Sequence, residues 1–549
     1  MVIWFLIICA TSPFLAEAKP QVIISVLLDD FGYSSATFNV ENPTSVLTPR
    51  LDSLAKQGII LRRHYSHTFC SPTRSSFLSG RFPVHVQMDN VQPDSVNAGV
   101  PVNMTTLPQK ICGEAWVCHA VGKYDTGAAT FAHTPEGRGF NSSLIYFSHA
   151  IDYFTHKDFS GTPSTGVCGD KLVDLWDSGK PAHSLNGTGY IDDLLLARIL
   201  SIIQSHNFSS GVGLYIHYTP HVTHDPLQVT KETLSRFNST TNDESLCLAS
   251  INVSDTGAVF PGADPTAPLH CRGVYEATVS VADEALGKVE DALRAAGVWD
   301  NTVLVLASDN GGQPDLTFGG GNNFPLRGGK GSMFEGGFRT AAFLSGGYLP
   351  QQSMGTVSQE LVHIADWYQT ICVLALGSES AAACSSDRAA ALSGLPAVDS
   401  VDVWDMLTSS TFRAHLPHAS GIALSPSTFL TKQWKLITGI VASGSGWSGL
   451  VFPNASSNKE NIQAMRLNCT VPCLFDLISD KEERYNIAPQ NPAIVTSLTQ
   501  QLEDWKKGFY TNNESAFECD LQGTPMSECP CKVGQETFGG FLGPYAHPL

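Results

Sequence analysis

Two segments of this chain are apolar at almost every position and then end abruptly in polar residues. Val22 to Leu28 leads into Asp29-Asp30-Phe31-Gly32, and Thr302 to Leu306 leads into Ser308-Asp309-Asn310-Gly311-Gly312. Strands buried on both faces have this continuous pattern, whereas strands with one solvated face alternate. The pattern predicts two strands of a largely parallel sheet. Because sites form at the carboxyl ends of such strands, we expect the two acidic ends to converge.

A helical period lies between these two segments. Apolar residues recur at helical spacing from Val274 to Ala296 and stop at Gly297, a residue suited to end a helix. The helix leads directly into the second strand, so an α/β fold is predicted. A further buried helix is expected from Leu361 to Leu376. Two stretches without clear periodicity, Thr230 to Pro268 and Gly377 to Ser393, are expected to be surface loops.

The pattern changes after about residue 410. Short strand-like segments such as Trp434 to Ile437 and Leu474 to Leu477 precede a predicted helix from Pro492 to Lys506. A small antiparallel sheet with a helix fits this part. The length of 549 residues also favours more than one unit. We therefore expect one large domain over residues 19–410 and a smaller α+β subdomain over residues 411–549.

The N-terminus has the features of a signal peptide. Residues 2 to 10 are apolar, and Ala16-Glu17-Ala18 is a small-x-small cleavage site, so residues 1–18 are expected to be removed. A short membrane anchor is the alternative, but the apolar run is well below the roughly 18 residues that a spanning helix needs. No later segment is long and apolar enough to span a bilayer.

The charge balance limits the partners. The chain has 33 Lys and Arg against 51 Asp and Glu, a formal net charge of −18. Such a chain repels polyanions at long range, so general nucleic-acid binding is not expected. An anionic substrate must therefore meet a local cluster of cations.

Sequons and cysteines both indicate the secretory pathway, with an extracellular or lysosomal destination. Sequons occur at Asn103, Asn141, Asn186, Asn207, Asn238, Asn252, Asn454, Asn468 and Asn513. Of fourteen cysteines, Cys9 lies in the signal segment and Cys70 in a motif discussed below, which leaves twelve, enough for six disulfides.

Spacing suggests some of the pairings without deciding them. Cys112 with Cys118 and Cys469 with Cys473 could close short loops. Three late cysteines could attach the C-terminal tail to the body: Cys519, Cys529 and Cys531. The alternative for Cys529-Pro530-Cys531 is a zinc pair.

The two acidic strand ends offer oxygen ligands only. Asp29, Asp30 and Asp309 supply carboxylates, and Asn310 supplies an amide oxygen. This donor set suits a hard cation, Ca²⁺ first and Mg²⁺ second. Each residue alone could equally be a turn residue at a strand end.

A cysteine motif favours the metal site over simple turn residues. Cys70-Ser71-Pro72-Thr73-Arg74, followed by Ser79-Gly80-Arg81, is the pattern that the formylglycine-generating enzyme reads when it oxidises a thiol to an aldehyde. Candidate cations and proton donors lie in three further segments: Gly122-Lys123-Tyr124-Asp125-Thr126-Gly127, His217 to Leu227 with His224, and Asn322 to Gly331 with Lys330.

The order of these motifs resembles the sulfatases, most closely the arylsulfatase B or N-acetylgalactosamine-4-sulfatase type, from Val22 to about Asn486. Further segments that carry the resemblance are Arg138-Gly139-Phe140, His224-Asp225-Pro226-Leu227-Gln228, Pro325-Leu326-Arg327-Gly328-Gly329-Lys330, Glu335-Gly336-Gly337, Val401-Asp402-Val403-Trp404, Leu474-Phe475-Asp476 and Glu482-Glu483-Arg484. The resemblance implies an alkaline-phosphatase-like fold and hydrolysis of sulfate esters, of aryl sulfates and of sulfated sugars in glycosaminoglycan-like polymers.

The resemblance also implies a role for each site residue. Asp29, Asp30, Asp309 and Asn310 would hold Ca²⁺ together with an oxygen of the formylglycine made from Cys70. Arg74 would stabilise the hydrated aldehyde, and Lys123 and Lys330 would bind sulfate oxygens. His224 would contact sulfate and protonate the leaving alcohol. One hydroxyl of the hydrate would attack sulfur, and loss of the second hydroxyl proton would release sulfate.

This chain departs from the family at one site residue. The family has Gly-Lys-Trp-His-x-Gly, whose histidine serves as the base for release of sulfate, whereas this chain has Tyr124 and Asp125. An aspartate can accept the same proton but adds negative charge near the metal carboxylates. We expect Asp125 to replace the histidine. His119, His133 or His221 could do so instead.

Two other functions are compatible with the pattern. A phosphoester hydrolase of the same superfamily would use two zinc ions and a Ser or Thr nucleophile, which disagrees with cysteine at position 70. A sulfatase-like protein that binds sulfated glycans with weak or no turnover is supported only by Asp125.

Overall fold

The fold is described from a computed structural model of the chain. It describes residues 19–40, 48–92, 95–96, 98–159, 168, 171–236, 251–253, 259–261, 272–314, 319–409, 416–441, 446–447, 468–512 and 517–548. The expected signal peptide and most of the expected loop from Thr230 to Pro268 lie outside these residues. No helix among the described residues is both long enough and apolar enough to cross a bilayer.

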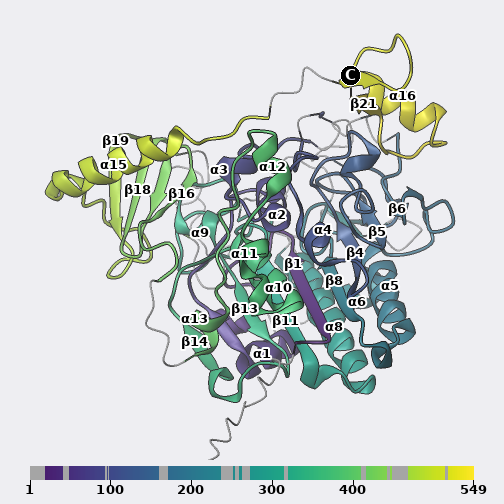
Figure 1. Cartoon of the computed structure of the whole chain (residues 1–549), viewed down its shortest axis with the longest axis horizontal. Coiled ribbons are helices and arrows are strands. Elements are labelled where there is room, and N and C mark those ends of the chain that lie inside the picture. Colours follow the sequence, from purple (N-terminus) through teal and green to yellow (C-terminus); the bar gives the residue numbers. More distant parts are fainter. Residues whose placement is uncertain are drawn as a thin grey trace, which may run out of the picture.

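A ten-stranded mixed sheet forms the centre of the molecule (Figure 1). In spatial order its strands are β14 (Thr356–Ser358), β2 (Ile59–Leu61), β13 (Ala342–Ser345), β11 (Thr302–Ser308), β1 (Val22–Leu28), β8 (Gly213–Thr219), β4 (Trp116–Lys123), β5 (Ser142–Tyr146), β6 (Trp176–Asp177) and β7 (Lys180–Pro181). The central run from β11 to β5 is parallel, and antiparallel pairs lie on both sides of it. The α/β fold with a largely parallel central sheet is confirmed.

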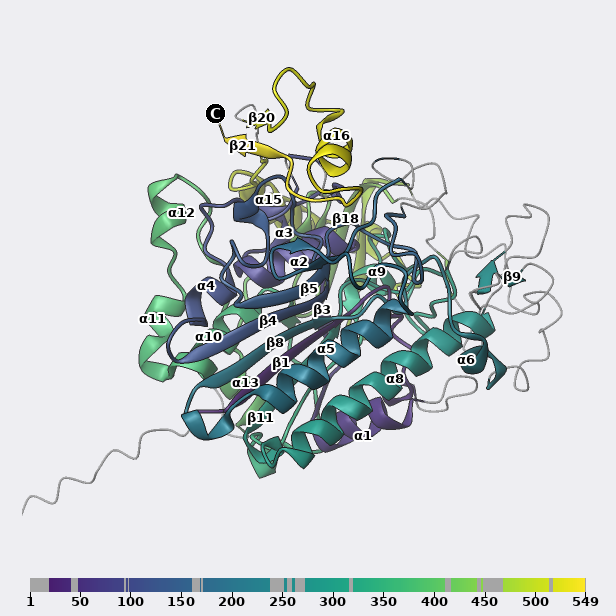
Figure 2. The ribbon, with the colours of Figure 1, turned by 90° about the vertical axis from the view of Figure 1, so that its right-hand side faces the viewer.

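Helices cover both faces of the sheet (Figure 2). One face carries α1 (Pro49–Gln57), α5 (Ile191–Ser205) and α8 (Arg272–Ala295), and the other carries α2 (Cys70–Ser79), α4 (Leu107–Ile111) and α10 (Asp366–Leu376). Alternate residues of β1 therefore enter two separate cores: Ile24 and Val26 pack on one side, and Ile23 and Leu27 on the other. This burial on both faces explains why β1 has no polar alternation.

Two sequence-based expectations need correction in this part of the chain. The helix expected from Leu361 begins only at Asp366, because Val362–His363 forms strand β15 beside β3 (His64–Tyr65). The loop expected from Gly377 to Ser393 contains η6 (Ser378–Ser380), α11 (Ala381–Cys384) and α12 (Arg388–Leu392). A disulfide between Cys372 and Cys384 holds α11 against α10. The spacing of apolar residues along the sequence does not reveal this contact.

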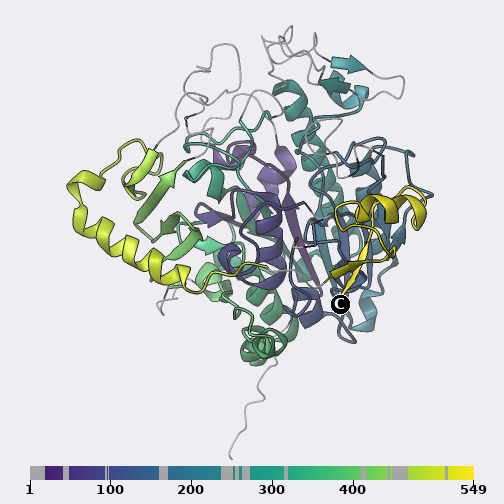
Figure 3. The ribbon, with the colours of Figure 1, turned by 90° about the horizontal axis from the view of Figure 1, so that it is seen from above.

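A second, antiparallel sheet follows in the chain and stands beside the large one (Figure 3). Its strands are β16 (Ile422–Ser425), β17 (Thr428–Leu430), β18 (Trp434–Ile440) and β19 (Asn468–Asp476). Helix α15 (Pro492–Lys506) covers one face and buries Leu498 and Leu502. The predicted antiparallel sheet and helix are present.

The last segment of the chain returns to the large sheet. It holds β20 (Phe517–Cys519), α16 (Cys529–Glu536) and β21 (Ala546–Pro548), and the amides of Tyr545 and Ala546 both donate to the Ala129 carbonyl. Disulfide Cys168–Cys531 attaches α16 to the body, and Cys519–Cys529 closes the tail itself. The zinc alternative for Cys529 and Cys531 is therefore wrong. The expected pairs Cys112–Cys118 and Cys469–Cys473 are both present.

The other elements are short. They are η1 (Thr37–Asn39), α3 (Pro83–Val86), η2 (Phe131–His133), η3 (Phe208–Ser210), α6 (Lys231–Ser235), β9 (Ile251–Val253), β10 (Val259–Pro261), η4 (Trp299–Asn301), α9 (Glu335–Phe338), β12 (Arg339–Thr340), η5 (Gln351–Ser353), α13 (Trp404–Thr408) and η7 (Ala488–Gln490).

Candidate active site

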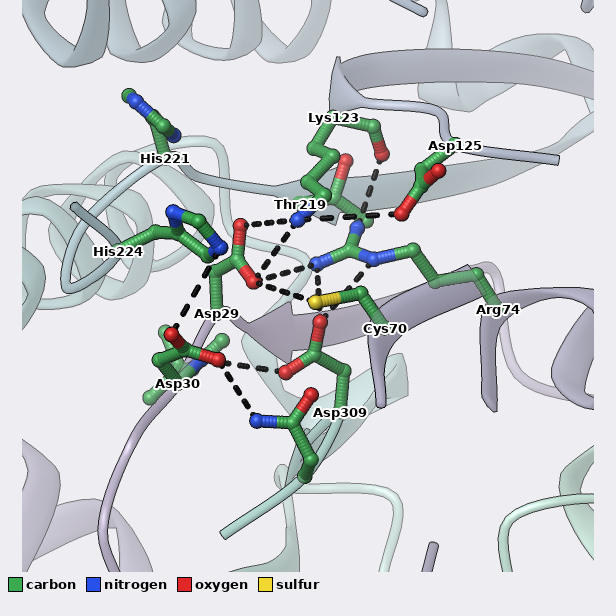
Figure 4. A network of polar contacts seen from close by, with 12 residues as sticks. Asp29, Asp30, Cys70, Arg74, Lys123, Asp125, Thr219, His221, His224 and Asp309 are labelled. Atoms are coloured by element: carbon green, nitrogen blue, oxygen red, sulfur yellow. Dashed lines mark hydrogen bonds and ion pairs between the residues drawn. The ribbon is translucent and has the colours of Figure 1, made fainter. Parts of the chain in front are cut away.

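The two acidic strand ends lie side by side. β1 and β11 are parallel neighbours with Leu28 opposite Ser308, so the next residues of both strands leave the sheet together. The Asp30 amide donates to Asp309 Oδ1 at 3.1 Å, and the Asn310 side-chain amide donates to Asp30 Oδ1 at 2.7 Å. The convergence expected from the strand pattern is present in Figure 4.

Helix α2 brings Cys70 to this acidic cluster. Cys70 is its first residue, its side chain is buried, and its thiol donates to Asp29 Oδ1 across 3.6 Å. Burial, with the nearby Asp309 carboxylate, raises the pKa of the Cys70 thiol to about 11. At neutral pH the encoded side chain is therefore a protonated thiol, a weak nucleophile.

Arg74 lies one turn along α2 and faces the same carboxylates (Figure 4). Its Nε and Nη2 both donate to Asp309 Oδ2, at 3.2 and 2.8 Å, and Nη1 donates to the Lys123 carbonyl at 3.0 Å. The guanidinium is 1% exposed, so Arg74 connects Asp309 and Lys123 through buried hydrogen bonds. Its i, i+4 spacing from Cys70 places both side chains on one face of the helix.

Two lysines bind different carboxylates of the cluster. Lys123, the last residue of β4, donates to both carboxylate oxygens of Asp29, at 3.1 and 2.9 Å. Lys330 donates to Asp30 Oδ2 at 2.8 Å. Burial opposes both charges, but Asp29 and Asp30 raise the pKa of Lys123 and of Lys330, respectively. Both ammonium groups therefore stay charged.

His224 completes the cluster. It follows β8, and its Nδ1 donates to the Asp225 carbonyl at 2.7 Å, while Nε2 lies 3.0 Å from Lys330 Nζ. Burial and Lys330 oppose protonation, but Asp29 and Asp30 raise the pKa of His224 well above its ordinary value. In this geometry, however, the Lys330 ammonium donates to a neutral Nε2, so His224 can act as a proton donor only when Lys330 has moved away from it.

The acidic cluster fits a hard cation. Ligand atoms of Asp29, Asp30, Cys70 and His224 lie within 4.8 Å of one another, and Asp309 adds a third buried carboxylate. The Asn310 Oδ1 atom is buried and has no hydrogen-bond partner among the described residues. A buried amide oxygen without a donor fits a metal ligand, since a cation would satisfy it.

Burial raises the pKa of Asp309 to about 7, and repulsion from Asp29 acts in the same direction. The cations around Asp29, Lys123 first, hold its pKa well below the ordinary value in spite of burial. The cluster therefore concentrates negative charge that a divalent cation would neutralise.

Asp125 lies next to this cluster, and its carboxylate is turned towards Lys123 (Figure 4). Its Oδ2 is 3.9 Å from Lys123 Nζ, and its Oδ1 accepts a hydrogen bond from His149 Nδ1 at 3.0 Å. Sequence reasoning missed His149, because it is a lone histidine between β5 and β6 without a motif around it.

The three histidines considered as replacements have other partners. His221 uses both ring nitrogens, with the Tyr146 hydroxyl at 2.7 Å and the Ile151 carbonyl at 2.8 Å. His119 bonds Ser142 Oγ at 2.7 Å, and His133 bonds Thr130 Oγ1 at 2.9 Å.

The structure thus joins all of the sequence-predicted site residues in one buried network of contacts. They are Asp29, Asp30, Cys70, Arg74, Lys123, Asp125, His224, Asp309, Asn310 and Lys330. A network of four carboxylates interleaved with two lysines, an arginine and a histidine suits binding of a tetrahedral oxyanion beside a metal ion.

Comparison with known proteins assigns the class. The family model described as Sulfatase matches residues 21–378, and the chain belongs to the sulfatase family. Membership supports sulfuric ester hydrolase activity. Arylsulfatase J of Mus musculus is 30% identical over 504 residues, which cover 89% of this chain and 76% of that protein. Arylsulfatase A of Bos taurus is 25% identical over 90% of this chain and 89% of its own length.

Solved structures share the fold. A structure of Ps i-CgsB in complex with k-i-k-neocarrahexaose superposes with a TM-score of 0.65 at 22% identity, covering 90% of this chain and 94% of that one. BT4656 in complex with its substrate D-glucosamine-2-N,6-O-disulfate gives a TM-score of 0.59 at 16% identity, covering 89% and 98%. The sulfatase resemblance and the fold class predicted from the sequence are both confirmed.

Proposed function

We propose that this protein hydrolyses sulfate esters with an aldehyde made from Cys70 and a bound Ca²⁺ ion. The observation that carries the proposal is the position of Cys70. Its buried Sγ lies against Asp29, between the acidic strand ends and the cations Arg74 and Lys123, in a chain of the sulfatase family.

Asp29, Asp30, Asp309 and Asn310 would hold the ion, together with an oxygen at position 70. All offer oxygen atoms, and the unpaired Asn310 Oδ1 supports this assignment. Oxygen ligands in this number favour Ca²⁺ over Mg²⁺, which demands stricter octahedral geometry.

Formylglycine at position 70, once hydrated, would supply one hydroxyl oxygen to displace the alcohol at sulfur and a second hydroxyl whose deprotonation would restore the aldehyde as the C–O bond to sulfate breaks. The chain's own residues do the rest. Arg74 steadies the hydroxyls, and Lys123 and Lys330 bind sulfate oxygens as their charges compensate the developing negative charge. His224 donates its proton to the leaving alcohol oxygen. Asp125 Oδ2 accepts the proton that is removed from position 70.

The substrate class we propose is a sulfated sugar, with small aryl sulfates as artificial substrates. Support comes from relatives named N-acetylgalactosamine-6-sulfatase, one of them the Homo sapiens protein at 26% identity over 65% of this chain, and from the disulfated glucosamine bound to BT4656. The 4-sulfatase type predicted from the motifs remains a proposal alongside these.

We further propose that the protein enters the secretory pathway, loses residues 1–18, receives glycans at its sequons and meets the formylglycine-generating enzyme on the way. The disulfides described above support an oxidising compartment. The proposed division into a catalytic domain over residues 19–410 and a subdomain over residues 411–549 places all of the proposed catalytic residues in the first unit.

The test combines mass spectrometry of residue 70 with measurements of ester hydrolysis. Peptide mass spectrometry across residue 70 should detect the aldehyde in secreted protein, and that protein should hydrolyse an aryl sulfate but not an aryl phosphate. A chelator should abolish turnover and Ca²⁺ should restore it. An intact thiol in active protein would overturn the formylglycine assignment. Preference for the phosphate would favour the phosphoesterase alternative, and binding of sulfated glycan without turnover would favour the binding protein.

A further inference from the structure

Asp125 and His149 form a pair that joins two neighbouring strand ends. β4 and β5 are parallel, with Lys123 opposite Tyr146, so the residues that follow both strands meet at the same edge of the sheet. His149 Nδ1 lies 3.0 Å from Asp125 Oδ1, and the two side chains are 12% and 0% exposed. A pair this well shielded from water has a fixed geometry.

The direction of the hydrogen bond follows from the chemistry of the two groups. An ionised carboxylate only accepts, so His149 Nδ1 carries the hydrogen and donates it to Oδ1. The other oxygen, Asp125 Oδ2, is buried and has no hydrogen-bond partner among the described residues. His149 therefore occupies one oxygen of Asp125 and leaves the other free on the side of Lys123, 3.9 Å away.

The backbone gives a second indication that this side chain is held in place. Asp125 has a φ of 49°, in the left-handed region that residues other than glycine adopt infrequently. Such conformations concentrate at functional sites, where the surrounding structure holds them. The hydrogen bond from His149 is one of the contacts that hold it.

We propose that His149 is the positioning residue of Asp125. By binding Oδ1 it holds the carboxylate with Oδ2 on the side of Lys123, where Oδ2 is free to accept a proton from the group at position 70. The family places a histidine at position 125 itself, whereas this chain uses an aspartate there and a histidine from the next strand end. The inference rests on the proposed function, and its tests are chosen so that the two can fail separately.

The first test uses protein that cannot carry the aldehyde. In the Cys70→Ala protein, NMR of ¹⁵N-labelled histidines should show a hydrogen-bonded Nδ1–H signal that disappears in a further His149→Leu variant. The same signal should shift and exchange with water when Asp125→Ala is added instead. If the signal is unaffected by Asp125→Ala, or is absent from the Cys70→Ala protein, the pair does not exist in solution and the proposal fails.

The second test separates positioning from packing. His149→Leu removes the donor at nearly constant volume, whereas His149→Asn places an amide N–H close to the position of Nδ1. We expect His149→Leu to lower kcat for an aryl sulfate by about tenfold to a hundredfold and to lower KM in parallel, so that kcat/KM is unchanged, because the affected step follows release of the aryl alcohol. His149→Asn should recover most of that loss. His119→Leu, a partly buried histidine that bonds Ser142 instead, is the matched control and should leave kcat unchanged.

A stopped-flow experiment identifies the affected step. The aryl alcohol leaves before the hydroxyl proton is removed, so His149→Leu should show a burst of alcohol equal to the enzyme concentration before a slower steady state. Equal losses in the Leu and Asn variants, a change in KM alone, or no loss at all would overturn the proposal. If the wild-type protein hydrolyses no sulfate ester, the proposed function fails, while the NMR experiment still decides whether His149 holds Asp125.

Discussion

At the scale of single residues, the site is a set of buried charges that compensate one another. Arg74 and Asp309 are each essentially buried, and their 2.8 Å contact joins helix α2 to the end of β11. Removal of one partner from such a pair leaves an uncompensated charge in the interior. The same carboxylate is therefore important for folding and, as a proposed ligand, for catalysis.

Asp309→Asn separates these two roles because it keeps the shape and removes the charge. We expect aryl sulfate turnover to fall by at least about a thousandfold, since Arg74 and the proposed metal ion would lose a shared carboxylate. Stability should fall by about 3 kcal/mol as Arg74 loses its partner, without loss of the fold. Turnover, Ca²⁺ binding by calorimetry and urea unfolding measure the three effects. Asp405→Asn, at an exposed acidic residue of α13, is the control, and wild-type turnover in Asp309→Asn would refute the metal assignment.

At the scale of elements, the close approach of two strands decides where Lys123 lies. Gly122 precedes Lys123 at the end of β4 and has a φ of 115°. A Cβ atom at this position would lie 1.9 Å from the Thr219 carbonyl oxygen of β8. The glycine of the Gly-Lys motif is thus required by the packing of two strands, which then directs Lys123 to Asp29.

Gly122→Ala should therefore push β4 away from β8 and displace Lys123. We expect a loss of about 2 to 4 kcal/mol in the free energy of unfolding, from the backbone clash and the left-handed conformation together. Sulfate ester turnover should fall in parallel. Gly113→Ala, where a Cβ would have no neighbour within 4 Å, should change neither quantity in urea unfolding and rate measurements. Unchanged stability in Gly122→Ala would contradict the argument.

His418, which precedes strand β16, joins that part of the chain to helix α10. His418 Nε2 donates to Asp366 Oδ2 at 2.8 Å, and Asp366 is the first residue of α10. Burial opposes protonation of His418, but the Asp366 carboxylate raises its pKa above the ordinary value. The folded protein therefore binds this proton more tightly than the unfolded chain does.

This contact should make stability depend on pH. Because the folded-state pKa of His418 is raised, its contribution is fully present below the unfolded value of roughly 6.5 and is lost as the pH rises through the folded value. Between pH 6 and pH 9, we expect the free energy of unfolding to fall by about 1 to 2 kcal/mol more in the wild-type protein than in His418→Gln. Urea unfolding of both proteins at the two pH values measures the difference. Parallel pH profiles would show that His418 is not the group responsible.

At the scale of the whole molecule, the C-terminal tail is held on the large sheet by covalent and backbone contacts. Cys168 and Cys531 are 363 positions apart in the sequence, whereas Cys469 and Cys473 are 4 apart. In the chain-entropy description, a disulfide restricts the unfolded chain more when it closes a longer loop. The two disulfides should therefore differ in their effect on stability.

In the double variant Cys168→Ser/Cys531→Ser, the free energy of unfolding should fall by up to about 5 to 6 kcal/mol. In Cys469→Ser/Cys473→Ser it should fall by about 2 kcal/mol. Limited proteolysis should also release the segment after residue 512 from the first variant only. Calorimetry and mass spectrometry of the fragments measure both effects. An equal loss of stability in the two variants would mean that chain entropy does not govern the tail.

Local patterns in the sequence were sufficient to predict several of the helices and strands. Helix α15 runs from Pro492 to Lys506 as predicted, and β1 ends where its polar residues begin, whereas β11 continues to Ser308, two residues beyond the predicted Leu306. Long-range contacts were not available to the same reasoning. Because β15 pairs with β3, α10 begins only at Asp366. The Cys372–Cys384 disulfide lies in the segment that was expected to be a loop and that contains short helices.

The sequence by itself determined which residues could do chemistry, because a cysteine motif, oxygen ligands at strand ends and glycine-bounded lysines are local patterns. Only the tertiary structure decided how these groups combine: that Lys123 binds Asp29, that Arg74 binds Asp309, and that His149 binds Asp125. The physical reason is that strand order and register bring together residues that are remote in the chain. No local pattern along the sequence records that order.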